Sequence, residues 1–289
     1  MTGLHREELS RLHGEGFCFP VELLSREEAA EVLRDVRRYE EIATRVGGVL
    51  GHHWTYPKSH LVAGWADRLV HDSRVLTVAE NVLGPDLLVW ATNLFFRKAG
   101  SPGELAWHQD APYFGWEDFH GRTVRMWIAL TDTDRDNGTM RYAPGTHHGG
   151  IMPHRYRGSG VSALLRGEEV EFDVDDETAV DVTLAAGQCS LHFPTTIHSS
   201  GPSVSLADRV CFAIDFIQPG VRPLAGPDSA LLVRGTDGSG HYDLEPRLGE
   251  EFDPAALRAF SRATKIRHER LMNVMRAGRT AGAAAGQAV

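Results

Sequence analysis

Residues 209–219, "RVCFAIDFIQP", form a short run of β-branched, aromatic and small apolar residues that ends at a proline. Comparable runs precede it at residues 87–100 ("LLVWATNLFFRKAG"), 123–132 ("TVRMWIALTD"), 138–147 ("GTMRYAPGTH") and 179–193 ("AVDVTLAAGQCSLHF"). Turn-forming residues, such as those at 136–138 and 144–145, separate the runs. Several short strands with frequent turns predict an all-β sandwich or barrel.

Helical patterns flank this strand-rich region. We expect helices at residues 5–14, 26–42, 67–83 and 254–277, the second beginning with a capping box formed by Ser25 and Glu28. Residues 43–66 lack periodicity and are interpreted as a functional or mobile loop, and residues 150–177 as a polar insertion. With no repeat or linker, residues 1–278 are expected to form a single domain, and residues 279–289 a disordered tail.

The composition excludes several classes of protein. The net charge is −9 without a basic stripe, which argues against a nucleic-acid partner. Apolar runs fall far short of the ~20 residues that a membrane helix needs, and the first residues lack the apolar core of a signal peptide. The three cysteines form no CxxC pair. They favour a cytoplasmic location and argue against a cysteine zinc site.

Residues 107–116, "WHQDAPYFGW", place His108 and Asp110 two positions apart. On a strand, such residues point to the same side, and His198 follows near the edge of a later strand. Two histidines and one carboxylate on one face of a metal form the facial triad of non-haem iron(II) oxygenases. Zinc accepts the same ligands, so these residues alone leave the metal open.

Arg209 lies eleven residues after His198. If residues 205–208 form a turn, Arg209 begins the returning strand of a hairpin and can reach the same cavity. Arginine suits the bidentate capture of a carboxylate. A 2-oxo diacid that chelates iron would leave its far carboxylate for Arg209. The charges of iron(II), Asp110, the diacid and Arg209 would then cancel, which lowers the cost of burying them.

The same spacing occurs a second time, in His241, Asp243, His268 and Arg279. His268 lies in a helical stretch, where a residue eleven positions on is ~16 Å away along the axis. No strands separate Asp243 from His268 to build a barrel. We therefore do not expect the second set to bind a metal.

With these motifs together, the chain resembles the phytanoyl-CoA dioxygenase family of iron(II)/2-oxoglutarate oxygenases. The resemblance runs from about "HGEGFCFP" to "FAIDFIQP" and includes "WHQDAPYFGW", "MWIALTDTDRDNGTMRYAPGTHH", "AAGQCSLHFPTTIHSSGPS" and "ADRVCFAIDF". It implies a mainly β fold with flanking helices, in which the core is a double-stranded β-helix (jelly roll, cupin-like). It also implies iron(II) as cofactor, with 2-oxoglutarate and O2 as co-substrates.

The spacing of residues 83–110, "LGPDLLVWATNLFFRKAGSPGELAWHQD", is similar to that of the branch that includes the iron halogenases acting on carrier-tethered amino acids. Those enzymes lack the carboxylate ligand, and chloride takes its place. Asp110 fills that position here. The resemblance therefore implies hydroxylation or a related oxidation.

Further residues are candidates for binding the co-substrate. The family places a tryptophan near 2-oxoglutarate, which implies this role for Trp127, although the residue could equally be a core aromatic. Asn93, Thr139 and Ser200 could donate hydrogen bonds to 2-oxoglutarate or be satisfied by the backbone.

Other residues are candidates for the substrate pocket. Arg125 shares a strand face with Trp127 and could bind a carboxylate or phosphate of the substrate, the alternative being a solvated rim position. Tyr113, Phe114 and Trp116 could form an apolar wall or simply pack in the core. His53, in the aperiodic loop, could belong to a lid or lie in solvent.

The sequence thus predicts an oxygenase that hydroxylates an unactivated C–H bond of a small molecule. The family branch suggests a natural-product intermediate or amino-acid derivative, either free or presented on a carrier protein or as a thioester. An alternative to hydroxylation is desaturation, epoxidation or cyclisation of the substrate by the same iron chemistry. A non-catalytic metal-binding jelly roll or a zinc hydrolase is a further alternative.

Overall fold

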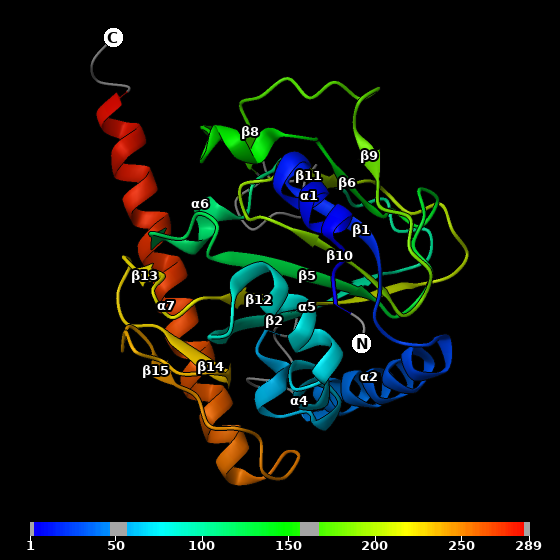
Figure 1. Ribbon diagram of the computed structural model, residues 1–289, viewed down its shortest axis with the longest axis vertical. Helices are drawn as coiled ribbons and strands as arrows, with labels where there is room; N and C mark the ends of the chain where they lie inside the picture. The colour runs from blue at the N-terminus through cyan, green and yellow to red at the C-terminus, as the bar shows by residue number, and fades with distance from the viewer. Residues whose placement is uncertain (1–2, 47–56, 157–167, 286–289) are drawn as a thin grey trace.

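The computed structural model describes residues 3–46, 57–156 and 168–285 and arranges most strands in two sheets (Figure 1). The larger, seven-stranded sheet has the order β1 (Phe17–Glu22), β10 (Gln188–His192), β5 (Thr123–Ala129), β12 (Arg209–Ile217), β2 (Leu87–Arg97), β14 (Ser229–Arg234) and β15 (Asp243–Leu244). The four-stranded sheet has the order β3 (Leu105–His108), β11 (His198–Ser200), β6 (Met140–Tyr142) and β9 (Val180–Asp181). Two short pairs complete the strands, β13 (Arg222–Pro223) with β4 (Trp116–Glu117) and β7 (His154–Tyr156) with β8 (Glu168–Val170).

The two sheets pack face to face as the double-stranded β-helix that the sequence predicts. Trp127 and Ala213 of the larger sheet share one buried cluster with Met140 and Tyr142 of the smaller sheet. All pairs within both sheets are antiparallel except β14 with β15. The strands can therefore present alternate residues to the interior between the sheets.

Alternation along β12 separates the two faces of the larger sheet. Phe212, Ile214 and Phe216 pack toward the helices, whereas Cys211 and Ala213 belong to the cluster between the sheets. Because Arg209 has the same parity as Cys211, its side chain also enters the interior. This single alternation positions one of the predicted site residues.

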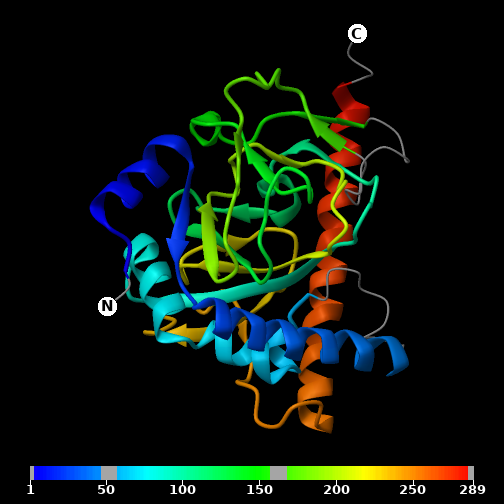
Figure 2. The same ribbon diagram turned by 90° about the vertical axis from the view of Figure 1, so that its right-hand side faces the viewer.

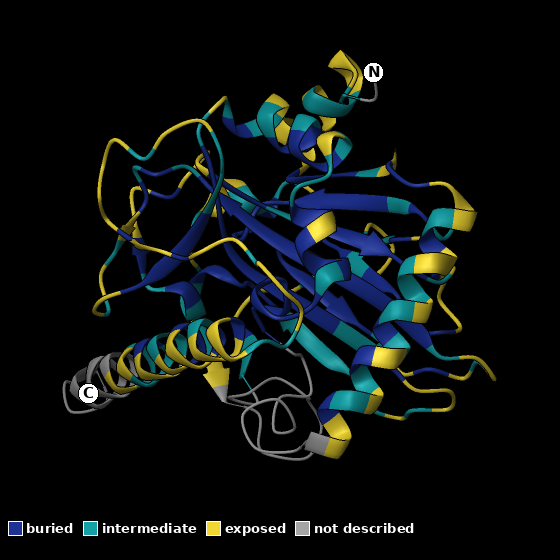
Figure 3. Cartoon of the chain, turned by 90° about the horizontal axis from the view of Figure 1, so that it is seen from below, coloured by how far each residue is buried: buried dark blue, intermediate teal, exposed yellow. Residues whose placement is uncertain are grey.

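Helices α2 (Arg26–Val46), α4 (Gly64–Val70) and α5 (Ser73–Leu83) cover the outer face of the larger sheet (Figure 1). Trp65 of α4 contacts Phe212 edge to face, with ring centres 4.9 Å apart. The remaining helical segments are α1 (Arg6–Glu15), η1 (Ser59–Leu61), α6 (Ala111–Phe114), η2 (Thr146–Gly149) and α7 (Pro254–Ala285). Figure 3 shows that the strands are mostly buried, whereas the helices expose their outer faces.

The long helix α7 runs along one side of the strands (Figures 1 and 2). Arg270 attaches it to the body of the protein by donating to Asp228 at 2.5 Å and to the carbonyl of Phe114. Both charged side chains of this ion pair are almost fully buried. The helix therefore has a fixed face toward the interior.

Some element boundaries differ from those expected. The helix expected at 67–83 is two helices, and Asp72 caps the second by accepting from the backbone of Arg74. The polar insertion contains the β7–β8 pair, and α7 extends beyond the expected end at 277. The capping box of Ser25 and Glu28 is confirmed in both directions. The single domain and the disordered tail stay predictions.

No helix in the described part of the chain combines the length and apolar character that crossing a membrane requires.

Candidate metal centre

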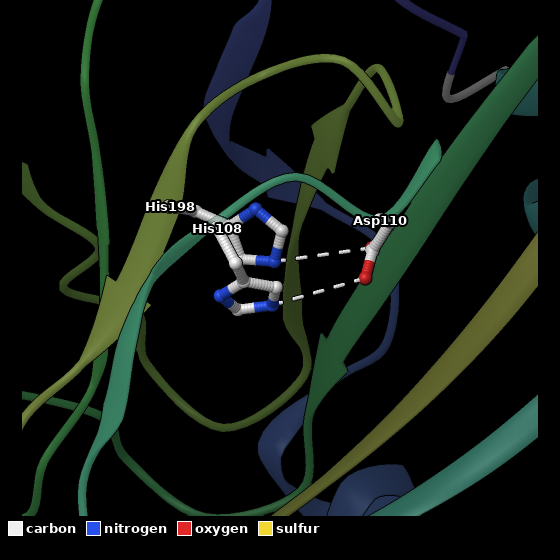
Figure 4. Close-up of side chains that lie close together, drawn as sticks. All are labelled: His108, Asp110 and His198. Atoms are coloured by element: carbon white, nitrogen blue, oxygen red, sulfur yellow. Dashed lines mark ion pairs between the residues drawn. The ribbon is translucent and has the colours of Figure 1, made fainter. Parts of the chain in front are cut away.

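His108, Asp110 and His198 converge at one buried point between the sheets (Figure 4). The two histidines are direct cross-strand partners on β3 and β11, with ring centres 4.2 Å apart. The Nε2 atoms of His108 and His198 lie 3.9 and 3.8 Å from the Asp110 carboxylate. Among the described residues this is the only cluster of three or more His, Cys, Asp or Glu side chains with metal-ligand spacing.

Asp110 reaches this point by a turn rather than by strand alternation. β3 ends at His108, and Asp110 has helical backbone angles (φ −77°, ψ −33°) as the N-cap of α6. Pro112 lies in the first turn of α6, a position that proline favours, and so helps the helix to begin directly after Asp110. The expectation that both residues share a strand face is therefore wrong in mechanism, although the two side chains do converge.

Gln109, between the two residues, fixes this turn. Its buried side-chain amide donates to the carbonyls of Gly150 and Thr195 and accepts from the backbone of Met152. The segment that carries His108 and Asp110 is thereby tied to two other loops. Such a brace restricts the ligand geometry without contacting the proposed metal.

Both histidines are held in one tautomer. The Nδ1 atoms of His108 and His198 lie 2.8 and 3.0 Å from the backbone carbonyls of Ala106 and Thr196. A carbonyl only accepts, so each Nδ1 carries the proton and each Nε2 keeps its lone pair toward Asp110. Burial lowers the pKa of His108 to about 3 and that of His198 to about 4, so both are neutral near pH 7. Neutral imidazole is the form that binds metals.

Asp110 is held in its charged form by Arg125. Burial alone would raise the pKa of Asp110, but the positive charge of Arg125, together with His198, His192 and His108, outweighs burial and holds this pKa well below its usual range. Arg125 donates to Asp110 at 2.5 Å and makes two further hydrogen bonds to Asp215, at 2.7 and 3.1 Å. Asp110 and Asp215 thus supply the negative charges that a buried arginine requires. Arg125 therefore needs no anion from the substrate, which was the reason for predicting that it binds one.

Arg209 faces the same interior from the opposite sheet. It begins β12, as expected, but β12 pairs with β2 and β5 and not with β11, so the expected hairpin is wrong. Its guanidinium lies 5.3 Å from the centre of the Trp127 ring and donates to the carbonyl of Gly138. Its Nε is buried without a hydrogen-bond partner, and no described carboxylate forms an ion pair with it. A buried arginine in this condition calls for an anionic ligand.

A cavity of about 430 Å³ connects these groups. The predicted residues that line it are Asn93, His108, Asp110, Tyr113, Phe114, Arg125, Trp127, His198, Ser200 and Arg209. Two predicted residues do not line it: Thr139 donates to the carbonyl of Val182, and Trp116 packs against Trp90 and Phe114 in a buried cluster. His53 lies outside the described residues.

Four residues near the site were not predicted from the sequence. Asp215 has the same parity as Arg209 on β12, and a lone aspartate in an apolar strand could have identified it. The Nε2 atom of His192 lies 3.7 Å from the Asp110 carboxylate. Its direction could not be inferred from that of His198, because Pro194 interrupts the strand between the two histidines. Arg267 and Arg270 of α7 also line the cavity, and no local pattern showed that this helix returns to it.

The second histidine set does not assemble. His268 lies on α7 and lines the cavity, whereas His241 and Asp243 are exposed at the far sheet edge, and no described group unites them. The position of a histidine in the fold, and not its spacing in the sequence, therefore distinguishes the two sets.

The family model for phytanoyl-CoA dioxygenase (PhyH) matches residues 12–211, which include the whole triad and Arg209. The chain belongs to this family. It is thus an iron(II)- and 2-oxoglutarate-dependent oxygenase.

Individual relatives support the same conclusion. The non-heme monooxygenase ThoJ, in its apo form, is 47% identical, with 93% of this chain and 98% of that chain covered and a TM-score of 0.87. A probable alpha-ketoglutarate-dependent hypophosphite dioxygenase of Stutzerimonas stutzeri is 27% identical over 82% of this chain and 86% of its own length. The ectoine dioxygenase of Nocardia farcinica (strain IFM 10152) is 27% identical over 70% and 74%.

Proposed function

We propose that His108, Asp110 and His198 are the iron(II) ligands of an oxygenase that hydroxylates an unactivated C–H bond of a small molecule bound in the 430 Å³ cavity. The observation that carries this proposal is the convergence of two Nε2 lone pairs and one ionised carboxylate on a single buried point. Two histidines and one carboxylate leave further coordination positions open, as non-haem iron oxygenases require.

The donor set fits a metal ion in its dimensions. Ligand atoms bound ~2.1 Å from one ion lie at most ~4.2 Å apart. The separations of 3.9 and 3.8 Å between the histidines and the carboxylate are below that maximum, and binding an ion on one face would draw these groups to the ~3.0 Å expected of adjacent ligands. Arg125 forms ion pairs with both Asp110 and Asp215, so its single positive charge faces two negative charges. A metal cation would offset the remaining negative charge at Asp110.

Arg209 is the proposed anchor for the far carboxylate of 2-oxoglutarate. Its buried, unpartnered Nε and its lack of a described carboxylate partner support this role. Trp127 would flank the co-substrate beneath the guanidinium, and Asn93 and Ser200 line the same space. Ser200 already donates to the carbonyl of Gly138 and accepts from Arg97, so its hydroxyl has no proton left to donate to 2-oxoglutarate.

When bound, iron(II) would activate O2 as the oxidant, with one oxygen atom entering succinate as 2-oxoglutarate loses carbon dioxide and the other entering the substrate's C–H bond. The chain's own residues supply position and exclusion of water. Arg125 and Gln109 hold the turn that carries Asp110, and the carbonyls of Ala106 and Thr196 fix the imidazole rings. Tyr113 and Phe114 form an apolar wall that would place the substrate's C–H bond beside the metal.

The proposed substrate is a natural-product intermediate or an amino-acid derivative, free or presented on a carrier protein or as a thioester. The cavity size is in the range that small organic ligands occupy. The presence of Asp110 favours hydroxylation, because its carboxylate would occupy the coordination position that chloride takes in the iron halogenases.

Anaerobic addition of iron(II) and 2-oxoglutarate tests the ligand set through the visible charge-transfer band of the chelate. The wild-type protein should develop the band, and Asp110→Ala and His198→Ala should not. A wild-type protein without a band, or variants with an undiminished band, would contradict the assignment. A small-molecule library screened for stimulated succinate release would then identify the substrate.

A further inference from the structure

Helix α7 supplies a second group of charges to the cavity. Arg267, Arg270 and His268 line it from this helix, opposite the strands that carry the triad. Both Nη atoms of Arg270 donate hydrogen bonds, one to Asp228 and the other to the carbonyls of Phe114 and Gly115, and only its Nε lacks a partner. Its role is structural, since these contacts attach the helix.

Arg267 differs from Arg270 in having no partner. It forms no hydrogen bond or ion pair with the described residues, and its Nη1 is buried and unsatisfied. Its guanidinium lies 4.7 Å from the centre of the Trp90 ring, which fixes it against the cavity wall. Burial lowers the pKa of Arg267, with Asp215 and Asp228 opposing this effect, and the side chain stays charged at neutral pH.

The formal charges around the cavity leave Arg267 in excess. Bound iron(II) and 2-oxoglutarate cancel each other, and Asp110 offsets Arg209. Asp215 and Asp228 then offset Arg125 and Arg270, to which they are hydrogen-bonded. Among the described cavity-lining arginines, Arg267 alone is left without a counter-charge.

Arg267 also lies at a useful place relative to the proposed metal. A continuous series of contacts runs from Asp110 through Arg125, the Phe114 ring and the Trp90 ring to Arg267. The aromatic rings form an apolar stretch between the two charged ends. A ligand held at Arg267 could lay its apolar part along these rings toward the triad.

We propose that Arg267 binds an anionic group of the substrate, a carboxylate or a phosphate, and thereby makes this enzyme selective for anionic small molecules. This inference rests on the proposed function only for the identification of the ligand as the substrate. Arg209 would thus bind the far carboxylate of 2-oxoglutarate, and Arg267 would bind the anionic group of the substrate.

The test is a calorimetric titration of the protein, loaded with iron(II) and 2-oxoglutarate under argon, with three probes. Phenylacetate and phenyl phosphate carry the two candidate anions, and phenylacetamide is the neutral control. The wild-type protein should bind at least one anion about tenfold more tightly than the amide, as expected for a charge-assisted contact. The tighter anion distinguishes carboxylate from phosphate.

Variants then assign the preference to Arg267. Arg267→Gln should lower the affinity of the preferred anion to that of the amide, and Arg267→Lys should retain part of the preference. Arg262→Gln is the matched control, because Arg262 is an exposed arginine of the same helix paired with Asp243. It should leave all three affinities unchanged.

Equal binding of the three probes, no binding of either anion, or an undiminished preference in Arg267→Gln would overturn the proposal. The wild-type comparison needs no variant, so the proposal can fail even if Arg267→Gln does not fold. A wild-type protein that develops no chelate band would contradict the proposed function but not the binding of an anion at Arg267. The titration can then be repeated without metal.

Discussion

The cavity has two walls that satisfy their charges differently. The strand wall (β3, β5, β11 and β12) carries the triad, Arg125 and Arg209, whereas the helix wall is the inner face of α7. On the strand wall, carbonyls and carboxylates of the chain orient almost every polar group. On the helix wall, Arg270 is engaged but Arg267 is not.

The two walls also differ in their relation to the family. The family match spans residues 12–211 and includes the triad and Arg209, but α7 begins at Pro254. We infer that the strand wall determines the reaction and the helix wall determines the choice of substrate.

The largest effect is expected from removing a ligand on the strand wall. Asp110→Ala should abolish the chelate band and lower succinate production by about 100-fold or more, because it removes a metal ligand and not merely a supporting contact. His268→Ala is the control on the opposite wall and should retain the band. The reverse result would show that the metal is on the helix side.

The next effect concerns the attachment of the helix wall. Arg270→Met leaves the buried Asp228 without its charged partner and should lower the free energy of unfolding by about 3 kcal/mol in a urea titration. Arg262→Met, at an exposed ion pair of the same helix, should change it by no more than about 0.5 kcal/mol. Equal losses in the two variants would contradict the anchoring role of Arg270.

A smaller effect should separate Arg209 from Arg267, the two cavity-lining arginines without a described carboxylate partner. Arg209→Gln should weaken 2-oxoglutarate binding about 30-fold through loss of a charged hydrogen-bonding partner, measured by titration of the chelate band. Arg267→Gln should change it by less than about twofold. If Arg267→Gln weakened 2-oxoglutarate binding more than Arg209→Gln, then Arg267 and not Arg209 would be the anchor for 2-oxoglutarate.

The smallest effect concerns the support of Asp110. Arg125→Lys keeps the charge but cannot span Asp110 and Asp215 together, so iron(II) affinity should fall about tenfold. Competition with a chelating indicator measures this affinity. An unchanged value would mean that Arg125 does not orient the carboxylate.

The sequence was most informative where local patterns determine position. Short runs of β-branched and aromatic residues between turn residues predicted the strands, and the order of His108, Asp110, His198 and Arg209 predicted their convergence. The turn at Asp110 was not anticipated, although Pro112 indicated it. The contacts between Arg125 and Asp215 depend on the pairing of β5 with β12, in which these residues are direct partners.

The helix wall could not be predicted in the same way. The composition indicated a helix at 254–277, but its interior face is set by the contact of Arg270 with Asp228, 42 residues apart in the chain. Long-range docking of this kind leaves no periodic signal. For the same reason, His268 could be dismissed as a metal ligand but not placed at the cavity.

The most direct test of the central claim is an anaerobic crystal structure with iron(II) and 2-oxoglutarate, using anomalous scattering at the iron edge. We predict one iron peak ~2.1 Å from Nε2 of His108, Nε2 of His198 and a carboxylate oxygen of Asp110, with the far carboxylate of 2-oxoglutarate at Arg209. An iron peak away from these three residues, or the co-substrate's carboxylate at Arg267, would contradict it.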